Sequence, residues 1–248
     1  MSGIVVVTGA SRGIGAATAR LGGRRGHAVC VNYMHGREEA ETVARHIREA
    51  GGRAIAVRAD TSVEADVERM FADVDDAFGA VTALVNNAGI TGGFRRVEEV
   101  DAELLERVLA VNVTGCFLCA REAVRRMSTK RGGKGGVIVN VSSTASSLGG
   151  GGEWVHYAAS KGAIDTFTVG LAREVAGEGI RVNAVNPGLI ATGLHAAAGA
   201  PERVERLAPA VPMGRGGTPD EAARAILWLI SDAASFVTGA RLPVSGGR

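Results

Sequence analysis

The sequence predicts an α/β protein built on a doubly wound parallel sheet of about seven strands, with helices on both faces. Short apolar runs alternate with longer amphipathic segments along the chain, and this alternation is typical of βαβ units. The strand runs are apolar on both sides, as expected for strands that helices cover on each face. No internal repeat or long linker divides the 248 residues, so a single domain spanning 1–248 is predicted.

The expected strands and helices follow one another in regular order. The strands are predicted at residues 3–8, 28–33, 53–58, 82–86, 136–142, 180–186 and 241–244. The helices are predicted at residues 13–25, 36–50, 62–78, 101–128, 155–176 and 219–231. Two glycine-rich stretches, 132–136 and 149–152, are expected to form loops at opposite ends of the fifth strand.

Composition and charge exclude several classes of protein. Apolar residues make up 46% of the chain and charged residues 22%, which excludes a disordered or fibrous protein. The net charge of +2 gives no reason to expect a nucleic-acid or membrane partner. No basic segment precedes the first apolar run, so no secretory signal is expected and a cytoplasmic protein is predicted.

Neither the cysteines nor the histidines indicate a metal or disulfide site. Three cysteines are an odd number in a long chain, which argues against a disulfide framework. Cys116 and Cys119 have C-x-x-C spacing, but they lack both a second ligand pair and a helix N-terminus. They are therefore expected to be small buried residues, and the five histidines show no metal-ligand spacing.

A glycine-rich turn joins the first expected strand to the first expected helix. The segment reads Thr8-Gly9-Ala10-Ser11-Arg12-Gly13-Ile14-Gly15. Glycines at such a junction permit a tight turn, let the backbone approach a pyrophosphate and allow the helix to pack closely on the strand. The spacing is G-x3-G-x-G instead of the better known G-x-G-x-x-G. The segment predicts a Rossmann-type dinucleotide site, and a glycine-rich turn without a ligand is the alternative.

Tyr157 and Lys161 form a second signal. The chain has only two tyrosines and three lysines, yet these two stand four residues apart and so share one face of the expected helix. Reduction of a carbonyl needs a proton for the nascent alkoxide, and a free tyrosine, with a pKa near 10, is a poor base at neutral pH. A nearby ammonium and an oxidised nicotinamide ring would lower that pKa by Coulomb attraction. A surface tyrosine lying over a lysine stem is the alternative.

These motifs together resemble those of the short-chain dehydrogenase/reductase family, and the resemblance covers essentially the whole chain. Residues 8–15 are similar to that family's cofactor loop, and Asn86-Asn87-Ala88-Gly89 is similar to its NNAG motif. Tyr157-Ala158-Ala159-Ser160-Lys161 resembles its YxxxK motif. Pro187-Gly188 with Thr192 resembles the segment that closes over the nicotinamide. The resemblance implies contacts to a nicotinamide dinucleotide at Gly9, Ser11, Arg12, Gly13, Ile14, Gly15, Tyr33, Asp60, Thr61, Asn87, Ala88, Gly89, Tyr157, Lys161, Pro187, Gly188, Ile190 and Thr192.

The resemblance also implies two further catalytic residues. Ser143 matches the serine that orients and polarises the substrate carbonyl, with Ser142 and Thr144 as alternatives. It stands one residue farther from Tyr157 than is usual in the family, and an extra loop residue would explain the difference. Asn112 matches the fourth catalytic residue. Because asparagine is unfavourable inside a helix, we expect Asn112 to distort the helix and hold water in a relay to the lysine. A satisfied polar residue in the helix packing is the alternative.

The end of the second expected strand bears on the choice of cofactor. NAD-preferring folds carry an acidic residue there to bind the ribose hydroxyls, whereas this strand ends Val31-Asn32-Tyr33-Met34. Arg12 can offer a charge-assisted bond to a 2′-phosphate, as in NADP(H)-preferring members, and an exposed surface arginine is the alternative. NADP(H) is therefore predicted, with NAD(H) as the alternative cofactor. Asp60 resembles the family's adenine contact, or else it caps the next helix in competition with Thr61 and Ser62.

The predicted function is NADP(H)-dependent interconversion of a carbonyl and a secondary alcohol, with Tyr157 as general acid/base. Residues 191–215 are expected to cover the substrate, and Glu153 and His195 are the nearest charged or titratable candidates for anchoring it. A basic stretch resembles the site where relatives dock an acyl carrier protein, and it tilts the prediction toward a 3-oxoacyl thioester or small ketone. Its residues are Arg121, Arg125, Arg126, Lys130, Arg131 and Lys134, with Arg173. The alternatives are a solvated helix end, a sugar or polyol dehydrogenase, and a non-catalytic dinucleotide sensor.

The resemblance further implies a homotetramer with two-fold axes. Apolar residues occupy more than one face of the helices expected at 101–128 and 155–176. A helix that is apolar on several sides must be buried on several sides, so one side would cover the sheet and another would meet a partner subunit.

Overall fold

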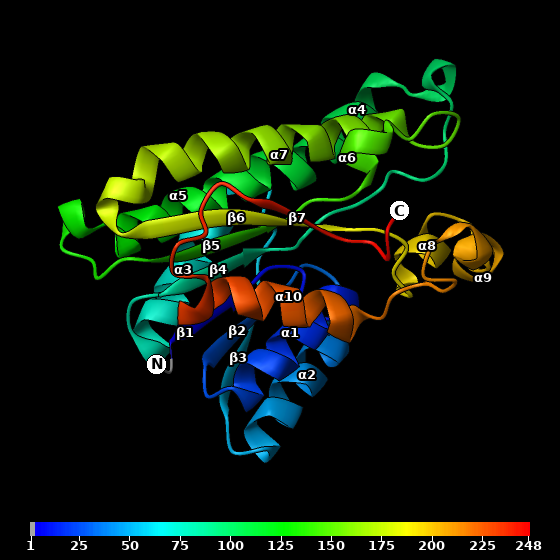
Figure 1. The fold of residues 1–248 in the computed structure, drawn as a ribbon. Helices are drawn as coiled ribbons and strands as arrows, with labels where there is room; N and C mark the ends of the chain where they lie inside the picture. The colour runs from blue at the N-terminus through cyan, green and yellow to red at the C-terminus, as the bar shows by residue number, and fades with distance from the viewer. Residues whose placement is uncertain (1–2) are drawn as a thin grey trace.

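Seven strands form one parallel sheet in the computed structural model, which describes residues 3–248 (Figure 1). The strand order is β3-β2-β1-β4-β5-β6-β7. The chain therefore starts in the middle of the sheet, builds outward to β3, crosses back to β4 and builds outward again to β7. This topology confirms the predicted doubly wound sheet. The expectation of no secretory signal rests partly on Met1. This residue lies outside the described residues.

The elements lie within two residues of their predicted bounds. The strands are β1 (Ile4–Val7), β2 (Ala28–Tyr33), β3 (Arg53–Arg58), β4 (Ala83–Asn86), β5 (Gly136–Val141), β6 (Ile180–Pro187) and β7 (Arg241–Val244). The helices are α1 (Gly13–Arg24), α2 (Arg37–Glu49), α3 (Glu64–Phe78), α4 (Ala102–Leu109), α5 (Gly115–Met127), α6 (Ala145–Leu148), α7 (Val155–Val175), α8 (Gly193–Ala197), α9 (Arg203–Leu207) and α10 (Pro219–Ile230). The sequence did not predict α6, α8 and α9, because four or five residues are too few to show a helical period.

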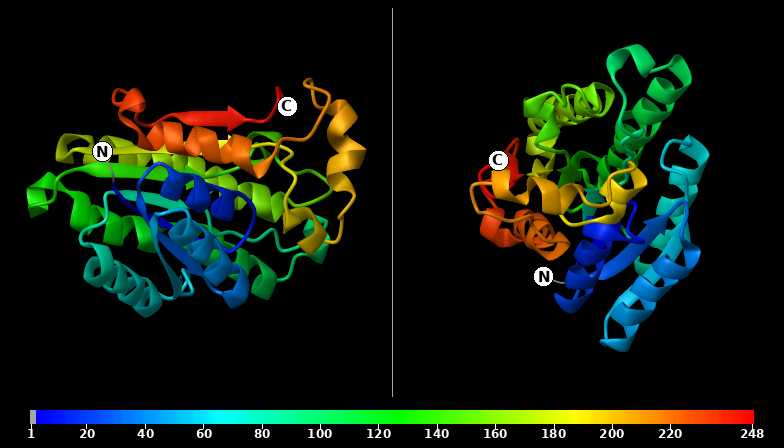
Figure 2. Two further views of the ribbon diagram at one scale, coloured as in Figure 1. Left: turned by 90° about the horizontal axis from the view of Figure 1, so that it is seen from below. Right: turned by 90° about the vertical axis from the view of Figure 1, so that its right-hand side faces the viewer.

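Two apolar layers cover the sheet. Val5 and Val7 of β1 face one layer, which α1, α2 and α10 form, whereas Val6 between them faces the other, which α3, α5 and α7 form. Alternate residues of a strand point to opposite faces, so strands that are buried on both sides must be apolar throughout. Figure 2 shows the two helical layers from two further directions. The three cysteines are buried and unbonded to one another, as expected. None of the helices within residues 3–248 is both long and apolar enough to cross a membrane.

The predicted helix at 101–128 is a distorted one. It consists of α4 and α5 joined by a π-helical turn, η2 (Ala110–Thr114), with Asn112 at its centre. The predicted distortion at Asn112 is therefore confirmed. A π-helical turn inside an α-helix changes the direction in which side chains project and is frequent at functional sites.

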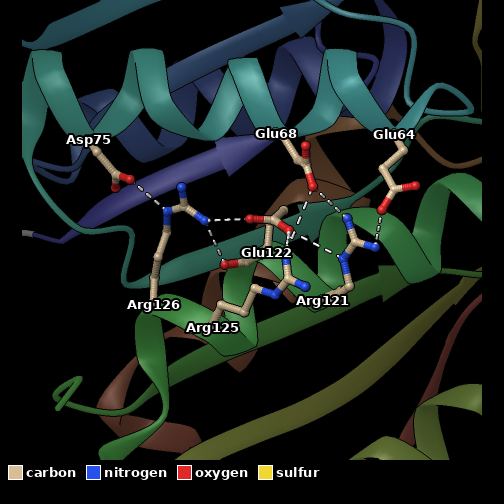
Figure 3. Close-up of polar contacts among 7 residues, drawn as sticks. All are labelled: Glu64, Glu68, Asp75, Arg121, Glu122, Arg125 and Arg126. Carbon is tan, nitrogen blue, oxygen red and sulfur yellow. Dashed lines mark hydrogen bonds and ion pairs between the residues drawn. The ribbon is translucent and has the colours of Figure 1, made fainter. Parts of the chain in front are cut away.

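An ion cluster joins α5 to α3 (Figure 3). Glu122 is buried and accepts hydrogen bonds from Arg125 (2.6 Å) and Arg126 (2.8 Å). Arg126 also donates to Asp75 at 2.7 Å, and Arg121 pairs with the carboxylates of Glu64 and Glu68. The basic stretch is thus largely neutralised within the protein.

More than half of the basic residues proposed to meet an acidic partner already have a carboxylate partner within the protein. Lys130 pairs with Glu178 at 3.0 Å, so four of the six basic side chains have carboxylate partners. Arg131, Lys134 and the neighbouring Arg173 are exposed, and no ion pair engages any of the three within the part of the chain that the structure describes. The structure therefore weakens the inference of an acyl-carrier docking surface, since most of its charge is already compensated.

Glu122→Gln is expected to destabilise the fold by about 1–3 kcal/mol at neutral pH, because Arg126 and its neighbours lose the carboxylate that compensates them. Burial alone would raise the pKa of Glu122, but the hydrogen bond from Arg126 and the charges of Arg125 and Arg126 outweigh it, so this pKa lies below its usual range. A depressed carboxyl pKa adds stability that is present above the unfolded-state value of 4.5 and is lost as the pH falls through the folded-state value.

Urea denaturation of the wild type and of Glu122→Gln at pH 7 and at pH 3.5 measures this difference, which should shrink at the lower pH. Glu106→Gln is the matched control, since Glu106 is exposed on α4. Equal losses in the two variants at pH 7 would contradict the account.

Candidate active site

A cleft of about 860 Å³ opens at the carboxyl ends of the central strands. It lies where the strand order reverses between β1 and β4, which is where open α/β sheets bind ligands. Every residue predicted for the cofactor or for catalysis lines this cleft, with two exceptions, Gly15 and Asn112. One wall belongs to the glycine-rich loop and the opposite end to α6, α7 and α8.

The glycine-rich loop requires glycine at three positions. Gly9 and Gly13 have φ values of 60° and 58°, which L-residues with side chains rarely adopt. A Cβ on Gly15 would lie 2.5 Å from the carbonyl oxygen of Gly9 and 2.6 Å from Nδ2 of Asn87. A cofactor contact was predicted at Gly15, but this residue does not line the cleft. It instead lets α1 pack closely behind the loop.

The loop and the start of α1 form a cradle that fits a pyrophosphate. The helix begins at Gly13 without a side-chain cap and without an acidic residue in its first turn. Its first N–H groups are consequently free of competing carboxylates and point toward the cleft's glycine-rich wall. This donor set suits the phosphates of a dinucleotide.

The NNAG segment fastens the glycine-rich loop to β4. Asn87 Nδ2 donates to the carbonyl oxygens of Thr8 (2.9 Å) and Gly9 (3.0 Å). Thr8 Oγ1 in turn accepts from the backbone N–H groups of Asn87 and Ala88, both at 2.9 Å. Both amide hydrogens of Asn87 are therefore used within the protein, so its side chain holds the loop in place.

The end of the cleft expected to hold the adenosine is built from the loops after β2 and β3. Asn32 Oδ1 accepts from the N–H of Gly9 at 3.1 Å, which ties β2 to the glycine-rich loop. Asp60 Oδ1 accepts from the N–H (2.9 Å) and the hydroxyl (2.7 Å) of Ser62. The cap residue of α3 is Val63, without a side-chain bond. The alternative that Asp60, Thr61 or Ser62 caps this helix is therefore wrong, since α3 starts two residues later than predicted.

Arg12 and Glu39 are charged side chains that line this end of the cleft together with Asp60. Arg12 is exposed at the cleft wall beside Tyr33, and within residues 3–248 no carboxylate pairs with it. Glu39, in the first turn of α2, also lines the cleft. Sequence analysis missed Glu39, because it searched for an acid at the end of β2 and this one lies on the following helix.

Tyr157, Lys161 and Ser143 meet at the other end of the cleft. Tyr157 and Lys161 are 7% and 4% exposed. The Nζ atom of Lys161 donates to the carbonyl oxygen of Val141 at 2.8 Å and lies 5.7 Å from the centre of the Tyr157 ring. The hydroxyl of Ser143 lines the same end of the cleft and lies near enough to Tyr157 to lower its pKa.

Among the three hydroxyl residues that follow β5, the geometry favours Ser143. Ser142 is buried and its hydroxyl donates to the carbonyl oxygen of Lys161 at 3.1 Å, away from Tyr157. Thr144 starts α6. Of the three, Ser143 is the one whose hydroxyl acts on the pKa of Tyr157, and the N–H of Ala145 holds that hydroxyl by donating to its Oγ at 3.1 Å.

Burial dominates the pKa values of the pair. It raises the pKa of Tyr157 to about 12, and the nearby hydroxyl of Ser143 lowers it only in part. It also lowers the pKa of Lys161 to about 8, and the smaller Coulomb effects of Cys116 and Asp165, which raise this pKa, do not offset it. From the sequence, the pKa of Tyr157 is expected to fall toward neutral pH, but the protein chain without a bound cofactor does not lower it. Tyr157 is protonated at neutral pH, as a proton donor must be.

Asn112 supports this site from behind. Its Oδ1 accepts from the N–H of Ile90 at 2.8 Å, and its Nδ2 donates to the carbonyl oxygen of Ile90 and to Ser160 Oγ, both at 2.9 Å. The amide hydrogens are thus both engaged in packing. A second, small void of about 10 Å³ lies between Asn112 and Lys161, a volume at the lower limit for one water molecule.

An aromatic and charged wall closes the substrate end of the cleft. Trp154 stacks on Phe94 with ring centres 4.8 Å apart. Arg203 of α9 is buried, lies 4.7 Å from the Trp154 ring centre and donates to both carboxylate oxygens of Glu153 at 2.6 Å. The hydrogen bond from Arg203 lowers the pKa of Glu153. Glu153 is therefore engaged, and its charge is not free to anchor a substrate.

Sequence analysis missed Arg203 and Phe94. Arg203 stands among alternating charges that look like a solvated helix face, and Phe94 lies in a loop that shows no period. Only the approach of α9 to the loop before α7 brings them together. His195 lines the cleft and is buried, and burial lowers its pKa, so it is neutral at neutral pH.

Comparison with known proteins agrees with this geometry. A family model described as enoyl-(acyl carrier protein) reductase, of the short-chain type, matches residues 9–248. The chain belongs to the short-chain dehydrogenase/reductase family.

Relatives and solved structures of this family match nearly the whole chain. The chain is 54% identical to the uncharacterized oxidoreductase YgfF of Escherichia coli (strain K12), over 99% of each chain. It is 43% identical to cis-4-hydroxycyclohexanecarboxylate dehydrogenase of Sinomonas cyclohexanicum, over 98% of this chain and 95% of that one. A dehydrogenase/reductase from Sinorhizobium meliloti 1021 has a similar structure, with a TM-score of 0.91 at 34% identity, covering 100% of this chain and 95% of that chain. The protein is thus an oxidoreductase of a family that uses nicotinamide dinucleotides.

Proposed function

We propose that this protein interconverts a carbonyl and a secondary alcohol with NADP(H), and that Tyr157 is the general acid/base. The observation that carries the proposal is the convergence of Tyr157, Ser143 and Lys161 on the cleft that also receives the glycine-rich loop. A dinucleotide-binding protein without chemistry would not need a buried tyrosine and a buried lysine there, which counts against the sensor alternative. One domain, 1–248, with a substrate-covering segment at 191–215 is part of the proposal.

Each residue has a distinct part in the proposed reaction. A bound nicotinamide would supply or accept the hydride at the substrate carbon. Ser143 would donate a hydrogen bond to the substrate oxygen, and Tyr157 would pass its proton to that oxygen as negative charge develops. The ammonium of Lys161 would stabilise the resulting phenolate by Coulomb attraction, and Asn112 would support a water molecule that reprotonates the pair.

Tyr157→Phe is expected to lower kcat for ketone reduction at least ~100-fold, because the ring remains but the proton donor is gone. Steady-state NADPH oxidation measures the loss. NADPH fluorescence titration is the control, and it should show binding close to that of the wild type. Substantial residual turnover would mean that another residue supplies the proton.

We further propose that NADPH is preferred over NADH. Tyr33 stands where an acid would repel a 2′-phosphate, and the exposed, unpaired guanidinium of Arg12 can bind it. Glu39 lies at the same end of the cleft and opposes this preference, so that NAD(H) remains the alternative cofactor.

Arg12→Ala should lower kcat/KM for NADPH about 10- to 100-fold, which corresponds to a lost charged hydrogen bond of about 1.5–3 kcal/mol, and should leave NADH nearly unaffected. The matched control is Arg24→Ala, which removes an exposed charge from the other end of α1. Equal effects on the two cofactors, or a wild type that prefers NADH, would overturn the assignment.

For the substrate, we propose a neutral, partly apolar ketone or secondary alcohol. Trp154, which stacks on Phe94, gives the substrate end of the cleft an aromatic surface, and the charge of Glu153 beside it is engaged by Arg203. The relative named cis-4-hydroxycyclohexanecarboxylate dehydrogenase supports a cyclic secondary alcohol, although its own substrate also carries a carboxylate, and a relative named glucose 1-dehydrogenase 2 supports the sugar alternative. A 3-oxoacyl thioester remains a candidate as a small molecule.

Acetoacetyl thioester on an acyl carrier protein should be reduced no better than the same thioester on a short pantetheine-like group, within about threefold in kcat/KM, because most of the basic stretch is neutralised. The comparison uses NADPH, with cyclohexanone as the neutral ketone and glucose with NADP⁺ as the sugar. A KM much lower for the carrier-bound substrate would restore the carrier-docking surface.

We also propose a homotetramer. Leu109 and Phe117 are 38% and 49% exposed on the helices α4 and α5, and Phe117 packs on Phe167 of α7 with ring centres 3.8 Å apart. These residues give the outer face of this layer an apolar surface of the kind that subunits bury against one another.

Light scattering at micromolar concentration should give about four times the chain mass of 25.4 kDa. Phe117→Arg should lower that mass, because it places a charge in the contact. A wild-type mass equal to one chain would refute the tetramer.

A further inference from the structure

Asp165 is a buried carboxylate that the proposed reaction does not use. It lies on α7, one helical turn beyond Lys161 and two beyond Tyr157, and only 7% of it is exposed. No ion pair engages it within residues 3–248, so its direct partners are hydrogen-bond donors, and the ammonium of Lys161 interacts with it by Coulomb attraction without contact. A buried charge held in this way is costly to keep unless its hydrogen bonds are needed.

Two donors from two other elements converge on this carboxylate. Ser146 of α6 donates its hydroxyl hydrogen to Oδ2 at 2.6 Å, and Asn186 of β6 donates from Nδ2 at 3.1 Å. Asp165 thus joins α7, α6 and the end of β6 at one point. These three elements surround the loop that carries Ser143.

The same donors reach the backbone of Ser143. Ser146 Oγ lies 2.8 Å from the Ser143 carbonyl oxygen, and Asn186 Nδ2 lies 3.3 Å from it. Ser146 has one hydroxyl hydrogen. It donates this hydrogen to Asp165, because the contact to the carboxylate is shorter and charge-assisted. Asn186 has two amide hydrogens and can serve Asp165 and the Ser143 carbonyl together. The orientation of Asn186, and with it the Ser143 loop, therefore depends on the acceptor at residue 165.

We propose that Asp165 is a positioning residue, which acts through Ser146 and Asn186 to hold Ser143 against Tyr157. The proposal rests on the proposed function, in which Ser143 polarises the substrate oxygen. It explains why a carboxylate, which can accept from both donors at once, occupies this buried place.

The charge of Asp165 has a second consequence. Asp165 and Cys116 act to raise the pKa of Lys161, against the larger effect of burial, which lowers it to about 8. The titratable groups that face Lys161 from the elements packed around it are Tyr157 and Asp165 on α7 and Cys116 on α5. Removing the negative charge of Asp165 should therefore let Lys161 lose its proton at a lower pH.

The first test is Asp165→Asn, which keeps the shape of the side chain but can accept at only one of its two terminal atoms. We expect kcat to fall at least ~10-fold, with the affinity for NADPH unchanged. The alkaline limb of kcat/KM against pH should move to lower pH by about half a unit or more. The matched control is Glu174→Gln, an exposed carboxylate on the same helix, which should behave as the wild type does.

A double-mutant cycle separates positioning from general damage to the fold. If Asp165 acts through Ser143, Asp165→Asn should lower kcat little further in a Ser143→Ala background, so the two losses are not additive. Ser146→Ala should lower kcat less than Asp165→Asn and leave the alkaline limb in place, because the charge at 165 remains. If Asp165→Asn does not fold, the double-mutant cycle is measured with Ser146→Ala and Ser143→Ala instead.

Additive losses of kcat in the cycle would overturn the proposal, as would an Asp165→Asn variant whose kcat and pH profile match those of Glu174→Gln. Failure of the proposed function has a different signature: the wild type would show no turnover, or Tyr157→Phe would keep it, and the role of Asp165 would fall with it.

Discussion

The hydrogen bonds between the loops that follow β1 and β4 set the geometry on which the rest of the site depends. Four hydrogen bonds of 2.9–3.0 Å join these loops. Two connect Thr8 with Asn87, one connects Asn87 with Gly9, and one connects Ala88 with Thr8. They hold together the two halves of the sheet at the point where the strand order reverses. Because the two loops diverge beyond this junction, a cleft opens there. These four hydrogen bonds, each between a side-chain atom and the backbone, thus fix the glycine-rich wall relative to the NNAG segment across the cleft.

Burial is the second constraint, and it acts in opposite directions on the two central side chains. Desolvation raises the pKa of Tyr157 to about 12 and lowers that of Lys161 to about 8. The protein chain therefore holds the tyrosine protonated and brings the lysine close to losing its charge at neutral pH. In the proposed reaction the charge of the oxidised nicotinamide would lower the pKa of Tyr157. The buried carboxylate of Asp165 is costly to bury, but it is useful because it helps Lys161 to keep its proton.

Several charged residues, both outside the cleft and in its lining, join segments that are distant in the sequence. Glu122 and its arginines connect α5 to α3, and Arg203 with Glu153 connects α9 to the loop before α7. In both cases, arginines that look free in the sequence meet a carboxylate from a distant segment. The difference between a docking surface and an internal ion cluster thus lies in partners that are about 50 residues away along the chain.

The sequence by itself determined the strand and helix order, the glycine-rich loop and the Tyr157–Lys161 pair, because each depends on neighbours within a few residues: apolar alternation, positive-φ glycines and a four-residue helical spacing. Even the distortion at Asn112 followed from a local conflict between side chain and helix. Only the tertiary structure decided that Gly15 packs behind the loop, that Asp60 caps no helix, that most of the basic stretch is neutralised, and that Asp165 and Arg203 are buried. Burial and charge compensation arise between segments far apart in the chain, and local spacing carries no record of which segments will meet.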